Sequence, residues 1–266
     1  MNEIETIFCK IFKCDRSGLY LNRRRSALSS KELNRLENIL KKRTQGEPLQ
    51  YLIGDADFMG INLKVSPGVL IPRPETEVLV EHVLDVLKRD KKPLRILDIG
   101  SGSGNIPIAI AKFSDRRDLK VYSVDISDVC LKTASLNAKR SGVENRIDFI
   151  KSDLFSGFKQ SEVFDYIVSN PPYIEEKEYL SLSTECHFEP KSALVADEGG
   201  FYFYRKIEEG ARKRLIPGGK LFLEIGDAQA EGIKKIFKDE TVWIDVKFMK
   251  DLCGRDRVAI IKKALS

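Results

Sequence analysis

The fold of this 266-residue chain is constrained most by a regular alternation of short apolar runs and helical patterns after residue 93. The runs have the length of β-strands and lie at 94–99, 119–124, 146–150, 164–168, 220–225, 242–248 and 257–262. Helical patterns separate several of them, for instance at 127–140 and 200–214. Because such alternation is typical of a parallel sheet with helices on both faces, the sequence predicts a doubly wound α/β fold.

The end of the predicted sheet differs from the rest. The last two runs are joined by residues 250–256, a connection too short for a crossover helix. They are therefore expected to pair antiparallel. The prediction is a mostly parallel sheet with an antiparallel terminal strand.

Two smaller regions precede the sheet. The first contains an apolar helical stripe (Ile4, Ile7, Phe8, Ile11 and Phe12) and a capping box at Ser29-x-x-Glu32. The second is punctuated by glycine and proline, and its alternating segment at 58–65 is typical of a β-hairpin. We therefore predict an N-terminal helical-bundle domain at 1–45, a β-hairpin linker at 46–72 and a sheet domain at 73–266.

The net charge of +5 is unevenly distributed. Residues 1–50 contain 11 Lys and Arg against 6 Asp and Glu, whereas the remaining residues are balanced at 34 of each. The sheet domain is therefore not expected to bind polyanions in general. Any basic partner surface is predicted at the N-terminus, where Arg23-Arg24-Arg25 forms a cluster.

Composition excludes several other classes of protein. No apolar run approaches the roughly 18–20 residues that span a bilayer, so no membrane association is expected. The first residues are acidic and no uninterrupted apolar region follows them, which argues against a secretory signal and favours a cytoplasmic location. The five cysteines form no C-x-x-C pair and there are two histidines, so the sequence predicts reduced thiols and no metal site.

A glycine-rich turn, Gly100-Ser101-Gly102-Ser103-Gly104, follows the first predicted strand, and Asp125 ends the second. Such a turn lets a ligand approach the backbone closely, and an acid at the second strand can accept hydrogen bonds from two ribose hydroxyls. A dinucleotide and S-adenosylmethionine (SAM) both fit this architecture. The G-x-G-x-G spacing and the preceding Asp98 favour SAM, because dinucleotide sites use G-x-G-x-x-G around a pyrophosphate. After the third strand, Asp153 is expected to accept from the adenine amino group, with Leu154 or Phe155 against the ring.

The fourth strand leads into Asn170-Pro171-Pro172-Tyr173. An Asn side-chain oxygen and a Pro carbonyl can together accept both hydrogens of an –NH₂ group, which aims the nitrogen lone pair at a methyl donor. Tyr173 offers a flat face to the planar group that carries the nitrogen. No strong base is needed, because the proton can leave after the nitrogen has been alkylated. Together with the glycine loop, the motif predicts methylation of a planar amine or amide.

The N-P-P-Y motif resembles that of DNA adenine methyltransferases, RNA guanine methyltransferases and glutamine methyltransferases of release factors. Other segments separate these classes, and they closely resemble the peptide chain release factor N(5)-glutamine methyltransferases (the HemK/PrmC family). The matching segments are 46–54, 58–60, 69–77, 167–174, 188–190, 204–205, 217–219, 223–226, 250–252 and 254–257. The resemblance runs from Gly46 to Val258 in the family's order and spacing, whereas residues 1–45 match in length and character.

The resemblance implies a class I SAM-dependent methyltransferase that methylates the glutamine side-chain amide in the Gly-Gly-Gln loop of class 1 translation release factors. Carried over by motif, SAM would be bound by Gly100, Ser101, Gly102, Ser103, Gly104, Asp125, Asp153, Leu154 and Asn170. The glutamine would be held by Asn170, Pro171, Pro172 and Tyr173, which are also the predicted catalytic residues. Many members carry Thr or Ala where this chain has Ser101, and some carry an aromatic residue at Leu154, which implies weaker adenine stacking here.

Two alternatives remain beside this interpretation. A DNA or RNA exocyclic-amino methyltransferase would need a basic groove and a recognition domain, which the charge-neutral region after residue 50 does not provide. A SAM-binding scaffold without activity is disfavoured by the intact Asn170–Tyr173 motif. We expect a monomer whose N-terminal domain docks an acidic face of the release factor through Arg23-Arg24-Arg25, with no direct nucleic-acid substrate.

Overall fold

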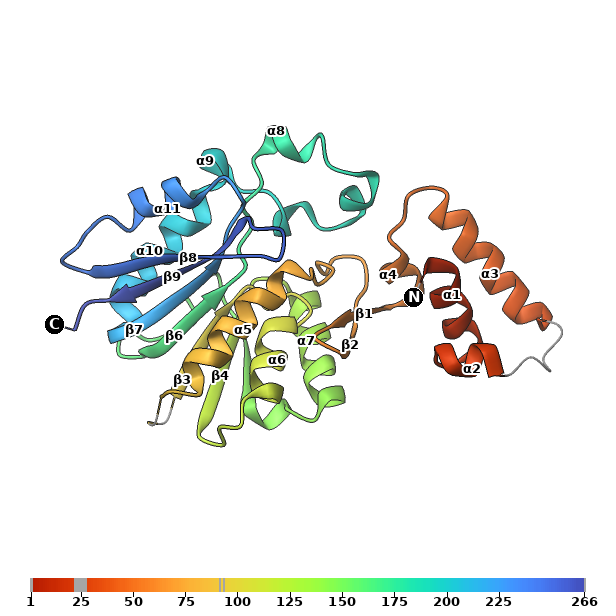
Figure 1. Cartoon of the computed structure of the whole chain (residues 1–266), viewed down its shortest axis with the longest axis horizontal. Helices are drawn as coiled ribbons and strands as arrows, with labels where there is room; N and C mark the ends of the chain where they lie inside the picture. Colours follow the sequence, from red (N-terminus) through yellow and green to blue (C-terminus); the bar gives the residue numbers. More distant parts are fainter. Residues whose placement is uncertain (1, 22–27, 91, 93, 266) are drawn as a thin grey trace.

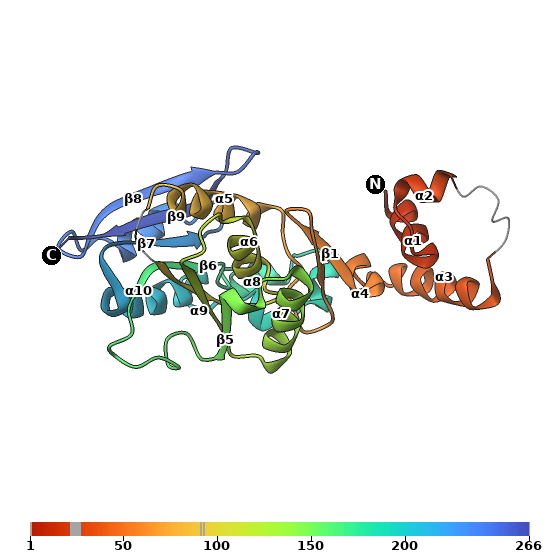
Figure 2. The same ribbon diagram turned by 90° about the horizontal axis from the view of Figure 1, so that it is seen from below.

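The computed structural model describes residues 2–21, 28–90, 92 and 94–265, and Figure 1 shows the whole chain. The Arg23-Arg24-Arg25 cluster lies outside the described residues. A group of short helices stands apart from a larger sheet domain, and the segment from α4 to β2 joins the two (Figures 1 and 2). Among the described residues, no helix is both long and apolar enough to cross a membrane.

The N-terminal helices are α1 (Glu3–Phe12), α2 (Arg16–Leu21), α3 (Ser30–Arg43) and α4 (Leu49–Ile53). The predicted capping box is present, since the Ser29 hydroxyl accepts from the backbone N–H of Glu32 and the Glu32 carboxylate accepts from that of Ser29. Ile7, Ile11, Ile39 and Leu49 form a small apolar core between these helices. The helices therefore bury a hydrophobic cluster of their own.

A two-stranded antiparallel sheet follows, formed by β1 (Asp55–Phe58) and β2 (Ile61–Lys64). Its buried Phe58 and Leu63 pack into the core of the sheet domain. Asp55 pairs with Lys10 of α1 and with Lys64 of β2, so one carboxylate connects the helices to the hairpin. The hairpin is thus anchored to both of its neighbours.

The central sheet has seven strands in the order β5-β4-β3-β6-β7-β9-β8. Their bounds are β3 Leu94–Ile99, β4 Leu119–Asp125, β5 Ile147–Lys151, β6 Phe164–Ser169, β7 Leu215–Glu224, β8 Trp243–Lys250 and β9 Asp256–Lys263. The first five along the chain are parallel, whereas β9 runs antiparallel between β7 and β8. The predicted fold class is confirmed. The strand predicted at 220–225 begins earlier, at Leu215, with a register shift opposite Phe164 and Tyr166.

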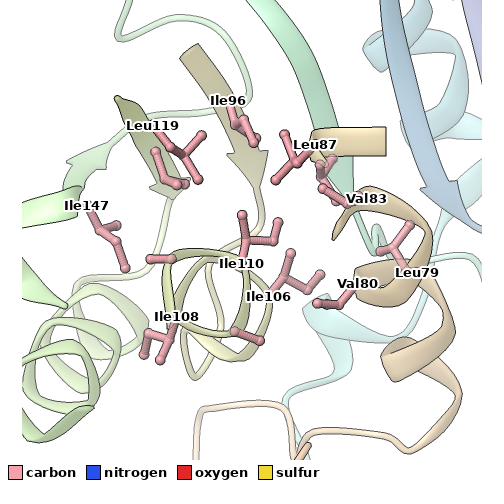
Figure 3. Packing of buried hydrophobic residues seen from close by; sticks show 14 of the residues in the cluster. Leu79, Val80, Val83, Leu87, Ile96, Ile106, Ile108, Ile110, Leu119 and Ile147 are labelled. Carbon is pink, nitrogen blue, oxygen red and sulfur yellow. The ribbon is translucent and has the colours of Figure 1, made fainter. Parts of the chain in front are cut away.

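Helices cover both faces of this sheet. One face is covered by α5 (Glu75–Leu87), α6 (Asn105–Phe113) and α7 (Asp128–Ser141), and the other by α10 (Tyr202–Arg214) and α11 (Ala230–Ile236). Figure 3 shows the first interface, where side chains from α5 and α6 meet Ile96, Leu119 and Ile147 of three strands. Burial of each such side chain stabilises the folded state by about 1.5–3 kcal/mol. This packing holds the strands, and therefore their ends, in fixed positions.

An arm between β6 and α10 projects beyond the carboxyl ends of the parallel strands (Figure 1). It contains the short helices α8 (Glu176–Tyr179), η2 (Thr184–Phe188), η3 (Lys191–Ala193) and α9 (Asp197–Gly200). Arg43 of α3 forms an ion pair with Glu185 of the arm, with 2.6 Å between Nη2 and Oε1. This ion pair links the N-terminal helices to the arm. The two strands beside β3 are β4 and β6, so the strand order reverses at β3. Ligands of open α/β sheets bind at such a reversal.

Candidate active site

The glycine-rich loop connects β3 to α6 at the carboxyl edge of the sheet. The backbone N–H groups of Gly100 and Ser101 both donate to the carbonyl of Val124, at 2.8 and 2.9 Å. Gly104 caps α6 with φ +82°, and a Cβ there would lie 2.9 Å from Ile108 and 3.0 Å from Ala134. Only glycine fits this position, because both the backbone conformation and the close packing exclude a side chain.

Two serines of the loop point away from the open site. Ser101 is buried, and its hydroxyl lies 2.6 Å from that of Ser123, which donates to Asp98 Oδ2 at 2.6 Å. Ser103 is also buried and bonded to Asn105. Burial raises the pKa of Asp98 to about 7. Asp98, which the sequence analysis used only as an acid beside the loop that favours SAM, therefore supports the loop from within the sheet.

Asp125 connects the glycine loop to the start of α7. Its Oδ2 accepts from the backbone N–H of Gly102 and its Oδ1 from that of Ser127, both at 2.9 Å. Each carboxylate oxygen keeps a second lone pair for another donor. The carboxylate is thus held in one orientation beside the cavity that its residue lines.

A cavity of about 200 Å³ lies at this edge of the sheet. It brings together Gly100, Gly102, Asp125, Asp153, Leu154, Asn170, Pro171 and Pro172 of the sequence-predicted residues, whereas Ser101, Ser103, Gly104 and Tyr173 are not in its lining. Gly68, Leu70, Cys130, Pro190, Ser192, Ala193 and Phe203 also line it and were missed by the sequence reasoning. These residues lie on four separate segments, and no local pattern in the sequence shows that the segments approach one another.

The second motif begins where β6 ends. The Ser169 hydroxyl donates to the carbonyl of Ile99 at 2.8 Å, which joins the ends of β6 and β3. Asn170 Nδ2 donates to Thr76 Oγ1 at 3.1 Å. Asn170 lines the main cavity and also a smaller one beside it, which Thr76 and Arg73 line. Asn170 therefore contributes to the walls of both cavities.

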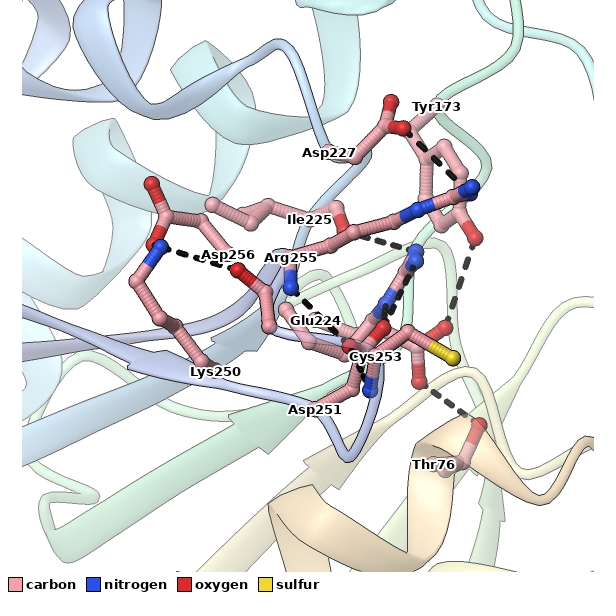
Figure 4. Close-up of polar contacts among 12 residues, drawn as sticks. Thr76, Tyr173, Glu224, Ile225, Asp227, Lys250, Asp251, Cys253, Arg255 and Asp256 are labelled. Atoms are coloured by element: carbon pink, nitrogen blue, oxygen red, sulfur yellow. Dashed lines mark hydrogen bonds and ion pairs between the residues drawn. The ribbon is translucent and has the colours of Figure 1, made fainter.

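The backbone of Tyr173 is fixed from the opposite side. Its carbonyl accepts from Gln229 Nε2 at 3.0 Å, and a Cβ on Gly200 would lie only 2.3 Å from that carbonyl. Gly200 also has φ +84°, so both the backbone conformation and the close contact exclude a side chain at this position. The Tyr173 hydroxyl lies 3.4 Å from Glu224 Oε1 (Figure 4). Burial raises the pKa of this hydroxyl.

Thr76 and Glu224 are polar site residues that the sequence reasoning did not single out. The Thr76 hydroxyl donates to Glu224 Oε2 at 2.6 Å, and both residues are almost completely buried. Burial raises the pKa of Glu224 to about 7. A usable signal was present, because Glu224 ends an apolar strand in the same way as Asp125 ends β4.

The mouth of the site is shaped by a buried acid from the arm. Glu189 accepts from the backbone N–H of Ile71 at 2.9 Å and pairs with Arg73. This contact explains the Phe188-Glu189-Pro190 and Pro72-Arg73-Pro74 segments, since it fixes the arm against the chain that enters α5. Among the described residues, no group of three or more His, Cys, Asp or Glu is placed to hold a metal ion.

A glycine loop, an acid at the second strand and an Asn-Pro-Pro segment at the fourth strand thus meet around one cavity. A solved methyltransferase from Pyrococcus furiosus has a similar fold, with a TM-score of 0.55 and 21% identity over 86% of this chain and 98% of that one. Residues 74–204 match the methyltransferase small domain, and residues 1–54 match the PrmC N-terminal domain. The protein is a methyltransferase.

Curated relatives define the family more closely. The release factor glutamine methyltransferase of Thermodesulfovibrio yellowstonii is 38% identical over 100% of this chain and 94% of its own length. That of Lactococcus lactis is 37% identical over 98% of this chain and 93% of its own length. The chain belongs to the release factor glutamine methyltransferase family. The predicted family, enzyme class and SAM cofactor are thereby confirmed.

Proposed function

We propose that the protein transfers a methyl group from SAM to the side-chain amide nitrogen of the glutamine in the Gly-Gly-Gln loop of class 1 release factors. The observation that carries this proposal is that Asn170 lines both cavities while its side-chain amide is bound to Thr76. Its Nδ2 is occupied by Thr76, so its Oδ1 is available to accept from an –NH₂ group. The 37–38% identity to named family members over nearly the whole chain supports the choice of substrate.

The proposed roles follow from position around the main cavity. The backbone of Gly100–Gly104 and the carboxylate of Asp125 would hold SAM, with Asp153 and Leu154 beside the adenine. The two fixed oxygens of Asp125 fit a pair of ribose hydroxyls. Ser101 and Ser103 would contribute through their backbone, because their side chains are buried and bonded within the protein.

The substrate amide would be held by Asn170 and a carbonyl of Pro171 or Pro172, with Tyr173 beside it. Bound SAM supplies an activated methyl group and its own leaving group. An amide nitrogen is a poor nucleophile, so the residues act mainly by alignment, which is worth roughly 7–11 kcal/mol in well-oriented systems. No base is required, since the nitrogen loses its proton after alkylation.

A protein loop suits this site better than a nucleic acid. The residues after position 50 carry 34 basic and 34 acidic side chains, and therefore no excess of positive charge for a phosphate backbone. We accordingly propose that class 1 release factors are the substrates and that the enzyme is a monomer. The alternative function is methylation of an exocyclic amine of DNA or RNA.

The direct test is a transfer assay with labelled SAM. The protein is expected to label a class 1 release factor, and not the same factor with its loop glutamine changed to alanine. DNA and RNA serve as separate acceptors in parallel reactions. Equal labelling of the glutamine-free factor, or labelling of nucleic acid alone, would contradict the proposed substrate.

The N-terminal domain is proposed to dock an acidic face of the release factor. Residues 1–50 contain the whole net positive charge, with Arg23-Arg24-Arg25 at its centre. Replacing these three arginines with alanine is expected to raise KM for the release factor several-fold and to weaken its salt dependence, because long-range attraction between charged surfaces is screened by salt. Steady-state kinetics at low and high salt measure both effects. An unchanged KM would assign the cluster to ordinary solvated surface.

A further inference from the structure

The Asn170 side chain is connected to a buried acid through one hydroxyl group. Its Nδ2 lies 3.1 Å from Thr76 Oγ1, which lies 2.6 Å from Glu224 Oε2. Thr76 and Glu224 are each 1% exposed. Figure 4 shows Thr76 and Tyr173 approaching the two oxygens of the same carboxylate. One acid therefore contacts Tyr173 directly and Asn170 through a single intermediate.

The charge of this acid sets the direction of each hydrogen bond. An ionised carboxylate only accepts, so Thr76 gives its single hydroxyl hydrogen to Glu224. The Thr76 oxygen then remains as an acceptor, and the group of Asn170 that faces it must be the NH₂. If the amide were reversed, Asn170 Oδ1 would compete for the same hydrogen and would leave a buried carboxylate oxygen unpaired, which is unfavourable.

We propose that Thr76 and Glu224 are positioning residues that orient the Asn170 side-chain amide so that its oxygen faces the nitrogen to be methylated. This inference rests on the proposed function, because it assigns a substrate contact to the Asn170 oxygen. It also gives a role to one residue in each of two segments that resemble the family. Thr76 belongs to the 69–77 segment and Glu224 to the 223–226 segment.

A third segment that resembles the family, residues 254–257, favours the ionised form of Glu224. Burial raises the pKa of Glu224, and Coulombic attraction to Arg257 opposes part of that rise. Arg257 Nε and Nη2 each lie 3.3 Å from Asp251 Oδ2, and its Nη1 donates to the carbonyl of Ile225 at 3.3 Å. Asp251 also accepts from the backbone N–H groups of Cys253 and Arg255. The turn between β8 and β9, which contains Asp251 and Arg255 (Figure 4), therefore holds the Arg257 side chain in place.

Protonation of Glu224 would reverse this arrangement. The Glu224 side chain is hydrogen-bonded to Thr76 of α5 and lies beside the Tyr173 hydroxyl, and the charges that act on it are those of Arg257 in β9 and Glu75 in α5. The Tyr204 hydroxyl of α10 donates to the backbone carbonyl of Glu224. Burial raises the pKa of Glu224 to about 7 against the opposing effects of Thr76 and Arg257. A protonated carboxyl can donate to Thr76, and the Thr76 hydrogen is then free to bind Asn170 Oδ1. Turnover is expected to fall as the pH drops through this pKa.

The first test compares two substitutions at one position. Thr76→Val keeps the shape and removes the hydroxyl, and it is expected to lower kcat by roughly tenfold to a hundredfold, as small misplacements of reacting groups do. Its affinity for SAM should stay close to that of the wild type, whereas its Tm is expected to fall by a few degrees, because a buried carboxylate oxygen loses its hydrogen-bond partner. Thr76→Ser restores the hydroxyl and is expected to recover most of the rate. Equal kcat for the Val and Ser variants would overturn the proposal.

The second test uses the pH profile of kcat at saturating SAM. The wild type is expected to lose activity below about pH 7, and Glu224→Gln, which cannot ionise, should have a lower kcat without that acidic limb. Folding of the variant is checked by its Tm. An acidic limb that persists unchanged in Glu224→Gln would contradict the assigned role.

A third measurement separates this proposal from the proposed substrate. The side-chain NH₂ signals of Asn170, identified by their loss in Asn170→Ala, report its hydrogen bond without any substrate. They should exchange slowly with solvent in the wild type and Thr76→Ser, and faster in Thr76→Val. If the wild type fails to methylate release factors, the substrate assignment fails while this measurement still tests the orientation. Equal exchange in all three proteins would overturn the proposal.

Discussion

Replacing Asn170 with alanine is expected to reduce kcat for methyl transfer by about 10²–10³-fold, the loss typical of a preorganised hydrogen-bonding group at a reacting centre. The substitution removes the oxygen that would hold one hydrogen of the substrate amide. It leaves the glycine loop and the Asp125 carboxylate in place, because their contacts are with Val124, Ser127 and one another. The dissociation constant for SAM should therefore change little.

Rapid-quench methyl transfer at saturating SAM measures the rate, and calorimetry measures the affinity for SAM. Asn62→Ala is a matched control, since Asn62 lies on β2 and its side chain contacts Arg140 at 3.4 Å on the surface. This control should behave as the wild type in both measurements. If Asn170→Ala loses SAM affinity by the same factor as rate, Asn170 acts mainly as a cofactor ligand and the proposed alignment of the amide is wrong.

Local sequence patterns were sufficient to predict the sheet. Each run of apolar residues between 94 and 262 corresponds to a strand. The inner strands β3 and β6 are buried on both faces and leave an almost unbroken hydrophobic signature, whereas the edge strands β5 and β8 are only partly buried. The antiparallel pairing of the last two strands was predicted from the short connection between them at residues 250–256. The spatial order was not predicted, since no pattern in the sequence shows that β9 inserts between β7 and β8.

The glycine loop shows where pattern recognition ends. Its position and its link to Asp125 follow from spacing along two consecutive strands. The directions of its side chains cannot be predicted from this spacing. Gly100, Gly102 and Gly104 all have positive φ, so the backbone changes direction at every second residue of the loop. As a result Ser101 and Ser103, which look equivalent to the glycines in sequence, point into the protein.

The hydrogen bonds that connect Asn170 to Thr76 and Glu224 could not be predicted from local sequence patterns. Thr76 lies 94 residues from Asn170 and 148 from Glu224 along the chain, so only the folded structure brings them together. Tyr173 illustrates the same point, because its hydroxyl is directed to Glu224 rather than to the main cavity. Motif residues can thus be recognised from sequence while the residues that orient them are found only in three dimensions.

Replacing Asp125 with alanine is expected to have the complementary effect, a large loss of SAM affinity with a much smaller change in kcat. Two hydrogen bonds to a charged carboxylate are worth about 1.5–3 kcal/mol each. Losing both to the ribose would raise the dissociation constant for SAM roughly 10²–10⁴-fold, at 1.4 kcal/mol for each factor of ten. The substitution also releases the backbone of Gly102 and Ser127, which would loosen the loop and add to the loss.

Asp128→Ala is the matched control for this experiment. Asp128 lies three residues away at the start of α7, and its carboxylate pairs with Lys151 at 2.6 Å where both side chains are about 60% exposed. An exposed pair contributes at most about 1 kcal/mol, so SAM binding should be nearly unchanged. Calorimetry gives the affinity, and methyl transfer at raised SAM concentration gives kcat. If Asp125→Ala binds SAM as tightly as Asp128→Ala, the second-strand acid does not hold the ribose, and the cofactor must occupy the cavity in another orientation.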